Sequence, residues 1–143
     1  MRFLLDVNVL IALLDPVHAH ASVAHDWFAS EGRASFATCP LTQNAVLRIF
    51  GNPRYPRSQG TPWAIVPLLK SLTALPGHEF WPDDISLLDA ERVRPEQLVS
   101  FARLTDDYLL ALAASRGAQL ATLDRRLRHD AVHGGEAAIR LLS

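Results

Sequence analysis

The chain has 143 residues, a length that predicts a single domain, and 49% of them are hydrophobic, enough for a buried core. Its 14 basic and 15 acidic residues give a net charge of −1, which argues against a disordered polyelectrolyte and a basic DNA-coating protein. The one cysteine, Cys39, can form neither an internal disulfide nor a cysteine-based zinc cage. Apolar runs fall far short of the ~20 residues that span a bilayer, and no signal peptide is expected. We therefore expect a cytoplasmic protein that makes no use of a membrane.

The first part of the chain alternates short apolar runs with helical patterns. Residues 3–5 are predicted to form a buried strand, and helices are predicted over 8–14 and from about 19 to 30. Residues 34–39 alternate in hydrophobicity as a second strand does, and Pro40 begins a third helix whose apolar positions keep a period of 3.6 residues.

The second part continues this alternation after a loop-like stretch. The elements expected here are helices over 62–75, from Pro95 through Phe101 and over 106–116 (capped by Thr105), and strands over 78–81, 119–123 and 138–142. Strands that alternate with helices require crossover connections, which make neighbouring strands parallel. The chain is therefore predicted to be a three-layer α/β/α domain with a mainly parallel central sheet.

Three acidic residues stand where chemistry is expected in such a sheet. Asp6 ends the first strand, Asp124 ends the strand over 119–123, and Asp106 stands at the head of the helix before that strand. Sites in open α/β sheets form outside the carboxyl ends of the strands. Because like charges held together raise one another's pKa, a fold that gathers these carboxylates needs a counter-cation. Oxygen ligands alone favour Mg²⁺ or Mn²⁺.

Each acid also has a purely structural explanation. Asp6 can cap the helix that follows the first strand, and Asp124 can cap a short helix after it. Asp106 and Asp107 lie at a helix N-terminus, where the helix dipole favours acidic residues. Only the combination of three acids at one predicted edge of the sheet favours a metal site.

Four sequence blocks carry a family resemblance. They are Leu-Leu-Asp-Val-Asn-Val-Leu (4–10), Cys-Pro-Leu-Thr-Gln-Asn-Ala-Val-Leu-Arg (39–48), Leu-Thr-Asp-Asp-Tyr-Leu-Leu-Ala-Leu-Ala (104–113) and Leu-Ala-Thr-Leu-Asp-Arg (120–125). The blocks resemble the motifs of PIN-domain ribonucleases, above all the toxin subunits of VapBC toxin–antitoxin pairs. They occur in the family's order and span almost the whole chain, which suggests one PIN-like domain over residues 1–143.

The resemblance implies an endoribonuclease that depends on Mg²⁺ or Mn²⁺. Asp6, Asp106 and Asp124 match family acids that hold the ion, and Asn8 and Thr122 match polar positions near the pocket that orient ligands or waters. The resemblance also implies an RNA substrate, a homodimer and a small antitoxin protein that covers the acidic pocket.

The second block departs from the family pattern at Gln43, where a Glu is usual. An amide offers a neutral oxygen, but it removes one negative charge and cannot act as a general base. We expect Gln43 to complete the metal shell directly or through water. The alternative is a PIN-fold module that binds antitoxin or RNA without cleaving it. Asp107 is a poor substitute for the missing Glu, because adjacent helix positions point about 100° apart. Asp89 is a more remote candidate for that role.

Other readings concern RNA contacts and a rival enzyme class. Arg48, Arg54 and Arg57 flank the second block, and Arg125, Arg126 and Arg128 follow the fourth. Both groups are candidates to hold the RNA backbone. Tyr55 and Trp63 are candidates to stack on an unpaired base.

The chain has more large aromatic residues than a core of this size must hold, which suggests that some of them form an interface with a partner. A haloacid-dehalogenase-type phosphatase needs a second acid two residues after Asp6, where this chain has Asn8.

Overall fold

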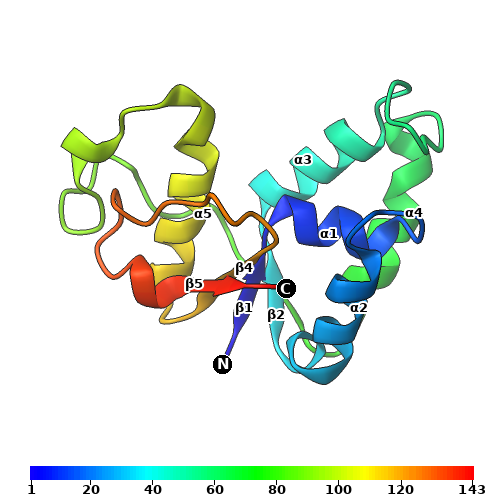
Figure 1. Cartoon of the computed structure of the whole chain (residues 1–143), viewed down its shortest axis with the longest axis horizontal. Coiled ribbons are helices and arrows are strands. Elements are labelled where there is room, and N and C mark those ends of the chain that lie inside the picture. The colour runs from blue at the N-terminus through cyan, green and yellow to red at the C-terminus, as the bar shows by residue number, and fades with distance from the viewer.

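The computed structural model describes all 143 residues, and a five-stranded sheet lies at its centre (Figure 1). The strands are β1 (Phe3–Leu5), β2 (Phe36–Thr38), β3 (His78–Phe80), β4 (Gln119–Thr122) and β5 (Ile139–Leu141). Their order is β3-β2-β1-β4-β5, and every neighbouring pair is parallel. The predicted α/β fold with its parallel sheet is therefore confirmed, and β1 lies at the centre of the sheet.

Helices cover both faces of this sheet. They are α1 (Val7–Leu14), α2 (Ala21–Ser30), α3 (Pro40–Phe50), α4 (Pro62–Thr73) and α5 (Leu104–Ser115). Phe3 and Leu5 of β1 belong to the core cluster beneath α1 to α4, whereas Leu4 belongs to the cluster beneath α5. Because successive side chains of a strand point to opposite faces, a wholly apolar β1 fits a strand that is buried on both sides.

The predicted helix from Pro95 through Phe101 is wrong. Only two 3-10 turns form here, Pro95–Gln97 and Phe101–Arg103. The Phe101 side chain is 95% exposed and Val99 is 74% exposed. A helix as short as this is not stable unless it buries an apolar face, and this segment buries almost none.

Several helices and strands also begin or end at residues other than those predicted. Thr105 does not cap α5, because the turn Phe101–Arg103 runs directly into the helix and Thr105 lies within its first turn. The second strand is shorter than residues 34–39, because Gly32–Ala34 forms a 3-10 turn and Cys39 is the N-cap of α3. No helix follows Asp124, so that residue is not a helix cap.

A buried ion pair joins the end of α1 to the loop between α3 and α4. The Asp15 carboxylate is only 2% exposed, and Arg57 Nε and the Tyr55 hydroxyl each donate a 2.7 Å hydrogen bond to its Oδ2. Burial alone raises the pKa of Asp15, but these bonds outweigh it and hold the pKa below its ordinary value. The Tyr55 and Arg57 side chains are therefore both bound to Asp15 within the fold.

The large aromatic residues divide between core and surface. Trp27, Phe28 and Trp81 are buried, whereas Trp63 is 82% exposed and Phe80 is 54% exposed. An interface that uses the exposed rings stays a prediction. None of the helices combines the length and the apolar character that a membrane crossing requires.

Candidate functional site

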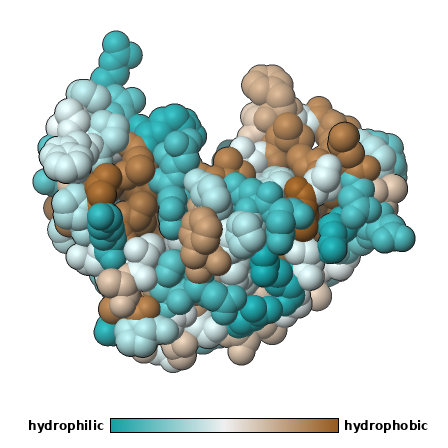
Figure 2. All heavy atoms as spheres, turned by 180° about the vertical axis from the view of Figure 1, so that it is seen from behind, coloured by the Kyte–Doolittle hydropathy of each residue, from teal (hydrophilic) through white to brown (hydrophobic).

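Asp6 lies where the two central strands end together. The register pairs Leu5 of β1 with Ala121 of β4, and the Asp6 backbone N–H donates to the Ala121 carbonyl at 2.9 Å. Because parallel strands end at the same edge of a sheet, the residues that follow β1 and β4 are brought side by side. Figure 2 shows that the surface at the end to which the strands point is hollowed between two lobes.

The Asp6 carboxylate is buried and hydrogen-bonded on both oxygens. Its Oδ1 accepts a 2.8 Å bond from the Val7 backbone N–H, and its Oδ2 accepts a 2.7 Å bond from the Thr122 hydroxyl. Asp6 is also the N-cap of α1, so the structural explanation and the placement at the strand ends hold together. Burial raises the pKa of Asp6 and the nearby Asp124 charge adds to this, while the two hydrogen bonds oppose it.

Asn8 and Thr122 connect Asp6 to the segment that carries Asp124. Asn8 Nδ2 donates to Thr122 Oγ1 at 3.3 Å, and Asn8 Oδ1 accepts from the Leu123 N–H at 3.1 Å. The Asp124 N–H donates to Thr122 Oγ1 at 3.0 Å. Two polar side chains thus hold the ends of β1 and β4 at a fixed spacing.

Asp106 and Asp124 line a cavity of about 220 Å³ that we call the acid pocket. Its lining residues are Ala102, Arg103, Asp106, Asp107, Asp124, Arg126, Leu127 and Arg128. Burial raises the pKa of Asp106 to about 6, and the negative charges of Asp6, Asp124 and Asp107 contribute. Asp6, Asp106 and Asp124 therefore lie close enough for their charges to interact.

These carboxylates form a site whose donor chemistry fits a divalent ion. None of the ion pairs in the chain involves Asp6, Asp106 or Asp124. At the same time, no three His, Cys, Asp or Glu side chains lie in an arrangement that could hold a metal ion. Because hydrogen bonds hold the Asp6 carboxylate, binding an ion would require the Asp106 and Asp124 side chains to turn toward it.

Gln43 has no hydrogen bond to any of these aspartates. Its Nε2 donates instead to the Thr38 hydroxyl at 3.0 Å. Gln43 also lines a groove of about 180 Å³ between α3 and α4, together with residues that include Leu47 and Lys70. Its expected place in a metal shell stays a prediction.

The cations of the acid pocket overlap only in part with those singled out in the sequence. Arg48 and Arg125 are exposed but do not line the pocket, so their RNA contacts stay predictions. Arg103, Arg126 and Arg128 do line it. Arg103 was missed as a pocket residue, because it lies in an irregular turn before α5 that no periodicity indicates. Asp107, which the sequence analysis set aside, also lines the pocket.

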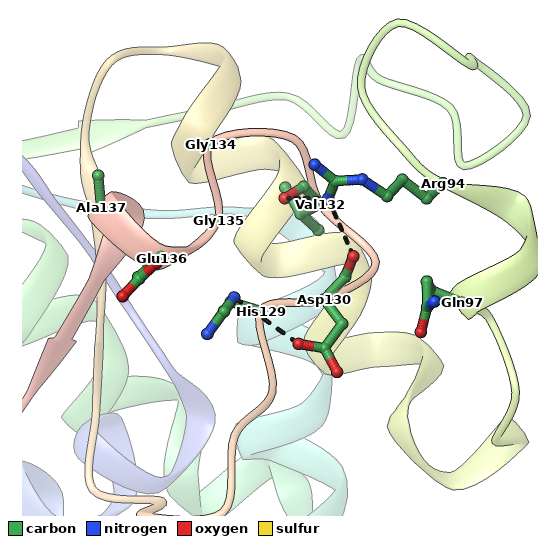
Figure 3. Close-up of a pocket in the computed structure, with 9 residues that line it drawn as sticks. All are labelled: Arg94, Gln97, His129, Asp130, Val132, Gly134, Gly135, Glu136 and Ala137. Atoms are coloured by element: carbon green, nitrogen blue, oxygen red, sulfur yellow. Dashed lines mark hydrogen bonds and ion pairs between the residues drawn. The ribbon is translucent and has the colours of Figure 1, made fainter.

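The largest cavity, about 690 Å³, lies elsewhere, on the loop before β5 (Figure 3). Arg94 Nη1 donates to the carbonyl oxygens of Asp130 at 3.0 Å and Val132 at 3.3 Å, which holds this loop in place. Gly134 adopts a φ of +75°, which allows the chain to turn there. Asp6, Asp106 and Asp124 do not line this cavity.

Comparisons with known proteins agree on one family. The family model described as the PIN domain matches residues 3–132. The chain is similar to Ribonuclease VapC39 and Ribonuclease VapC44 of Mycobacterium tuberculosis, with 39% and 40% identity over 134 residues, which are 94% of this chain and 96% and 94% of those proteins.

Two solved structures share the fold. One is VapBC2 from Rickettsia felis bound to a DNA fragment from its promoter, with a TM-score of 0.63 and 12% identity over the whole of both chains. The other is VapC20 from Mycobacterium tuberculosis, a toxin that cleaves the sarcin–ricin loop, with a TM-score of 0.61 and 15% identity over 95% of this chain and 94% of that chain.

Proposed function

Because this chain belongs to the PIN domain family, we propose that it is an endoribonuclease that depends on Mg²⁺ or Mn²⁺ and acts as the toxin of a toxin–antitoxin pair. One observation carries the chemistry: the charges of Asp6, Asp106 and Asp124 interact at one end of the sheet, and none of the three carboxylates forms an ion pair. Its similarity to proteins named ribonucleases supports RNA as the substrate. No observation favours the alternative of a non-cleaving module.

The three carboxylates would hold the ion. A bound divalent ion lowers the pKa of a coordinated water and offsets negative charge on the scissile phosphate. Thr122 and the Val7 N–H fix the orientation of Asp6 from behind, so that its remaining lone pairs are available to a ligand. Asp106 must lose its proton before it can bind a cation, and its raised pKa makes this step sensitive to pH.

Arginines would place the RNA backbone at the acids. Arg103, Arg126 and Arg128 line the same cavity as Asp106 and Asp124. Their guanidinium groups can donate paired hydrogen bonds to phosphate oxygens. Arg128 already pairs with Asp130, so Arg103 and Arg126 are the groups that remain for phosphate.

A direct test uses purified protein and a labelled single-stranded RNA. We expect cleavage with Mg²⁺ or Mn²⁺, none in EDTA, and loss of cleavage in the Asp6→Asn variant. Cleavage that persists in EDTA, or in Asp6→Asn at the wild-type rate, would overturn the metal assignment. A manganese-soaked crystal with anomalous density between these carboxylates would locate the ion.

The proposed partners are an antitoxin protein and a second copy of the chain. The proposed location of the protein is the cytoplasm. The likeness to the VapBC2 structure supports the first, and the exposed Trp63 and Phe80 rings support an interface of some kind. Light scattering tests the homodimer, for which we expect twice the 15.8 kDa of one chain. A monomer at micromolar concentration would contradict it.

A further inference from the structure

Shared side chains connect the acid pocket to two further cavities. A small cavity of about 20 Å³ shares Arg103, Asp107 and Arg128 with the acid pocket. The small cavity in turn shares Gln97 and Asp130 with the largest cavity, whose volume is about 690 Å³. A side chain that lines two cavities lies between them. The three cavities therefore form a row that leads from the acids to the largest cavity.

The loop after β4 forms part of the wall along the whole row. Its residues Asp124 and Arg128 line the acid pocket, and its residue Asp130 lines the other two cavities. Arg94 Nη1 donates to two carbonyl oxygens of this loop, at 3.0 and 3.3 Å, and thereby holds the wall of the largest cavity in place (Figure 3). An RNA strand bound at the acids and following this loop would meet a preformed cavity on the same surface.

The charges of the largest cavity favour a nucleobase over a phosphate. Its lining holds two carboxylates, those of Asp130 and Glu136, against one guanidinium, that of Arg94. The Arg94 guanidinium already donates to the loop carbonyls, and Asp130 pairs with Arg128. Glu136 is exposed and takes part in none of the ion pairs of the chain. Its carboxylate repels a phosphate, but it can accept hydrogen bonds from the amino group of a base, as carboxylates do from cytosine.

Two further side chains of the largest cavity also suit a base. The Gln97 amide is exposed and can both donate and accept, as amides do at the edge of adenine. The His129 ring lines the same cavity and offers a flat face on which an unpaired base can stack. A volume of about 690 Å³ lies within the range of about 300 to 1,000 Å³ that small-molecule sites have, so a nucleoside fits.

We propose that the largest cavity binds an unpaired base of the RNA, and that it prefers a base with an amino group to uracil. The RNA strand runs from the acid pocket past Arg128 and Asp130, with its phosphates at the acid pocket and one base in the cavity. The cavity selects which RNA is bound and takes no part in the chemical step. This inference rests on the proposed ribonuclease function, because it places the cleaved bond at the acid pocket.

Backbone-amide NMR in EDTA tests the cavity without any cleavage. The probes are the 5′-monophosphates of adenosine, cytidine, guanosine and uridine, with inorganic phosphate as the control for phosphate binding alone. We expect the first three nucleotides to shift the signals of Gly134 and Ala137, which line the cavity. The uridine nucleotide should bind about tenfold more weakly, because it has no amino group to donate to Glu136. Unchanged Gly134 and Ala137 signals, the same shifts with phosphate alone, or equally tight binding of the uridine nucleotide would overturn the proposal.

Glu136→Gln tests the carboxylate in the cleavage of single-stranded RNA. We expect KM to rise about tenfold with kcat unchanged, because the base binds away from the reacting phosphate, and the discrimination against uridine should disappear. Glu96→Gln is the matched control, since Glu96 is exposed in the neighbouring turn and lines none of the three cavities. A wild-type KM in Glu136→Gln, or an equal rise in Glu96→Gln, would overturn the role of the cavity. If the wild-type protein cleaves no RNA, the proposed function fails, while the NMR signals still decide whether the cavity binds a base.

Discussion

Thr122 Oγ1 donates a 2.7 Å hydrogen bond to Asp6 Oδ2 across 116 positions of sequence. The same oxygen accepts from the Asp124 N–H and from Asn8 Nδ2, so one buried hydroxyl uses all of its hydrogen-bonding capacity. This contact joins the ends of the two central strands. The position of Asp6 relative to Asp124 is therefore set by the sheet itself and not by a loop.

We expect Asp6→Asn to lower RNA cleavage by about 100-fold or more, because it removes a negative charge from a site that depends on electrostatic stabilisation. The variant should fold normally, and its melting temperature at pH 7 should equal or exceed that of wild type, since a buried carboxylate with a raised pKa is replaced by a neutral amide. Thermal denaturation and cleavage assays check both. Asp89→Asn, at a partly exposed residue paired with Arg92, should keep full activity, and equal losses in both variants would refute the assignment.

The metal-free protein should lose stability as the pH rises from about 4 to 6. The pKa of Asp106 is about 6 in the folded chain against an ordinary value of 3.8, so the folded state binds this proton more tightly than the unfolded state. The stabilisation from the protonated Asp106 is therefore fully present below the ordinary pKa of 3.8, and it is lost as the pH rises through the folded-state pKa of about 6. Its upper limit is about 3 kcal/mol, reduced because the side chain is partly exposed.

Urea denaturation in EDTA at several pH values measures this effect, and Asp106→Asn should flatten the profile. Mn²⁺ affinity should rise over the same pH range, because the ion competes with the proton. A wild-type stability that rises between pH 4 and 6, together with the same pH profile in Asp106→Asn, would contradict the raised pKa.

Tyr55→Phe should lower the free energy of unfolding by about 1 to 2 kcal/mol, because it removes a hydrogen bond to the buried Asp15 carboxylate. Arg57→Ala should also destabilise the fold, because the carboxylate then loses its cation. Asp15→Asn combined with each change completes a double-mutant cycle in urea. Strictly additive effects would show that the pair does not interact in solution.

Arg103→Ala and Arg126→Ala should each weaken RNA binding and reduce the salt dependence of that binding. Each phosphate contact contributes about 0.7 to the slope of log affinity against log salt for a single strand. Fluorescence anisotropy in the Asp6→Asn background measures binding without cleavage. Arg33→Ala provides the matched control, since this exposed residue lies in the turn before β2 begins. A slope that is unchanged in both pocket variants would exclude these phosphate contacts.

Local patterns predicted the elements that bury a regular apolar surface. The apolar run of β1 and the 3.6-residue period of α3 place those elements correctly, because burial and periodicity are local properties. The segment from Pro95 through Phe101 was wrongly predicted as a helix, because its local pattern does not show that it buries almost no apolar side chain and forms only 3-10 turns. Asp6 and Asp124 could be placed from the strands that precede them, and Arg103 could not, since it lies in an irregular turn.

The partner of Gln43 could not be predicted either. A glutamine in a family motif suggests a ligand by analogy, whereas its observed partner is the Thr38 hydroxyl, five residues earlier and on a strand. Which way a side chain turns at a helix N-terminus is decided by nearby unpaired polar groups, and these are visible only when the strands have been assembled.

The central position of β1 also determines how late in synthesis the sheet can form. Strand β1 leaves the ribosome first but pairs with both β2 and β4, and β4 ends only at Thr122. Because the sheet joins segments that are far apart in sequence, it cannot close while most of the chain is still being translated. Asp6 and Asp124 can therefore be brought together only after β4 has been synthesised, and the arrangement of acids at the strand ends forms late.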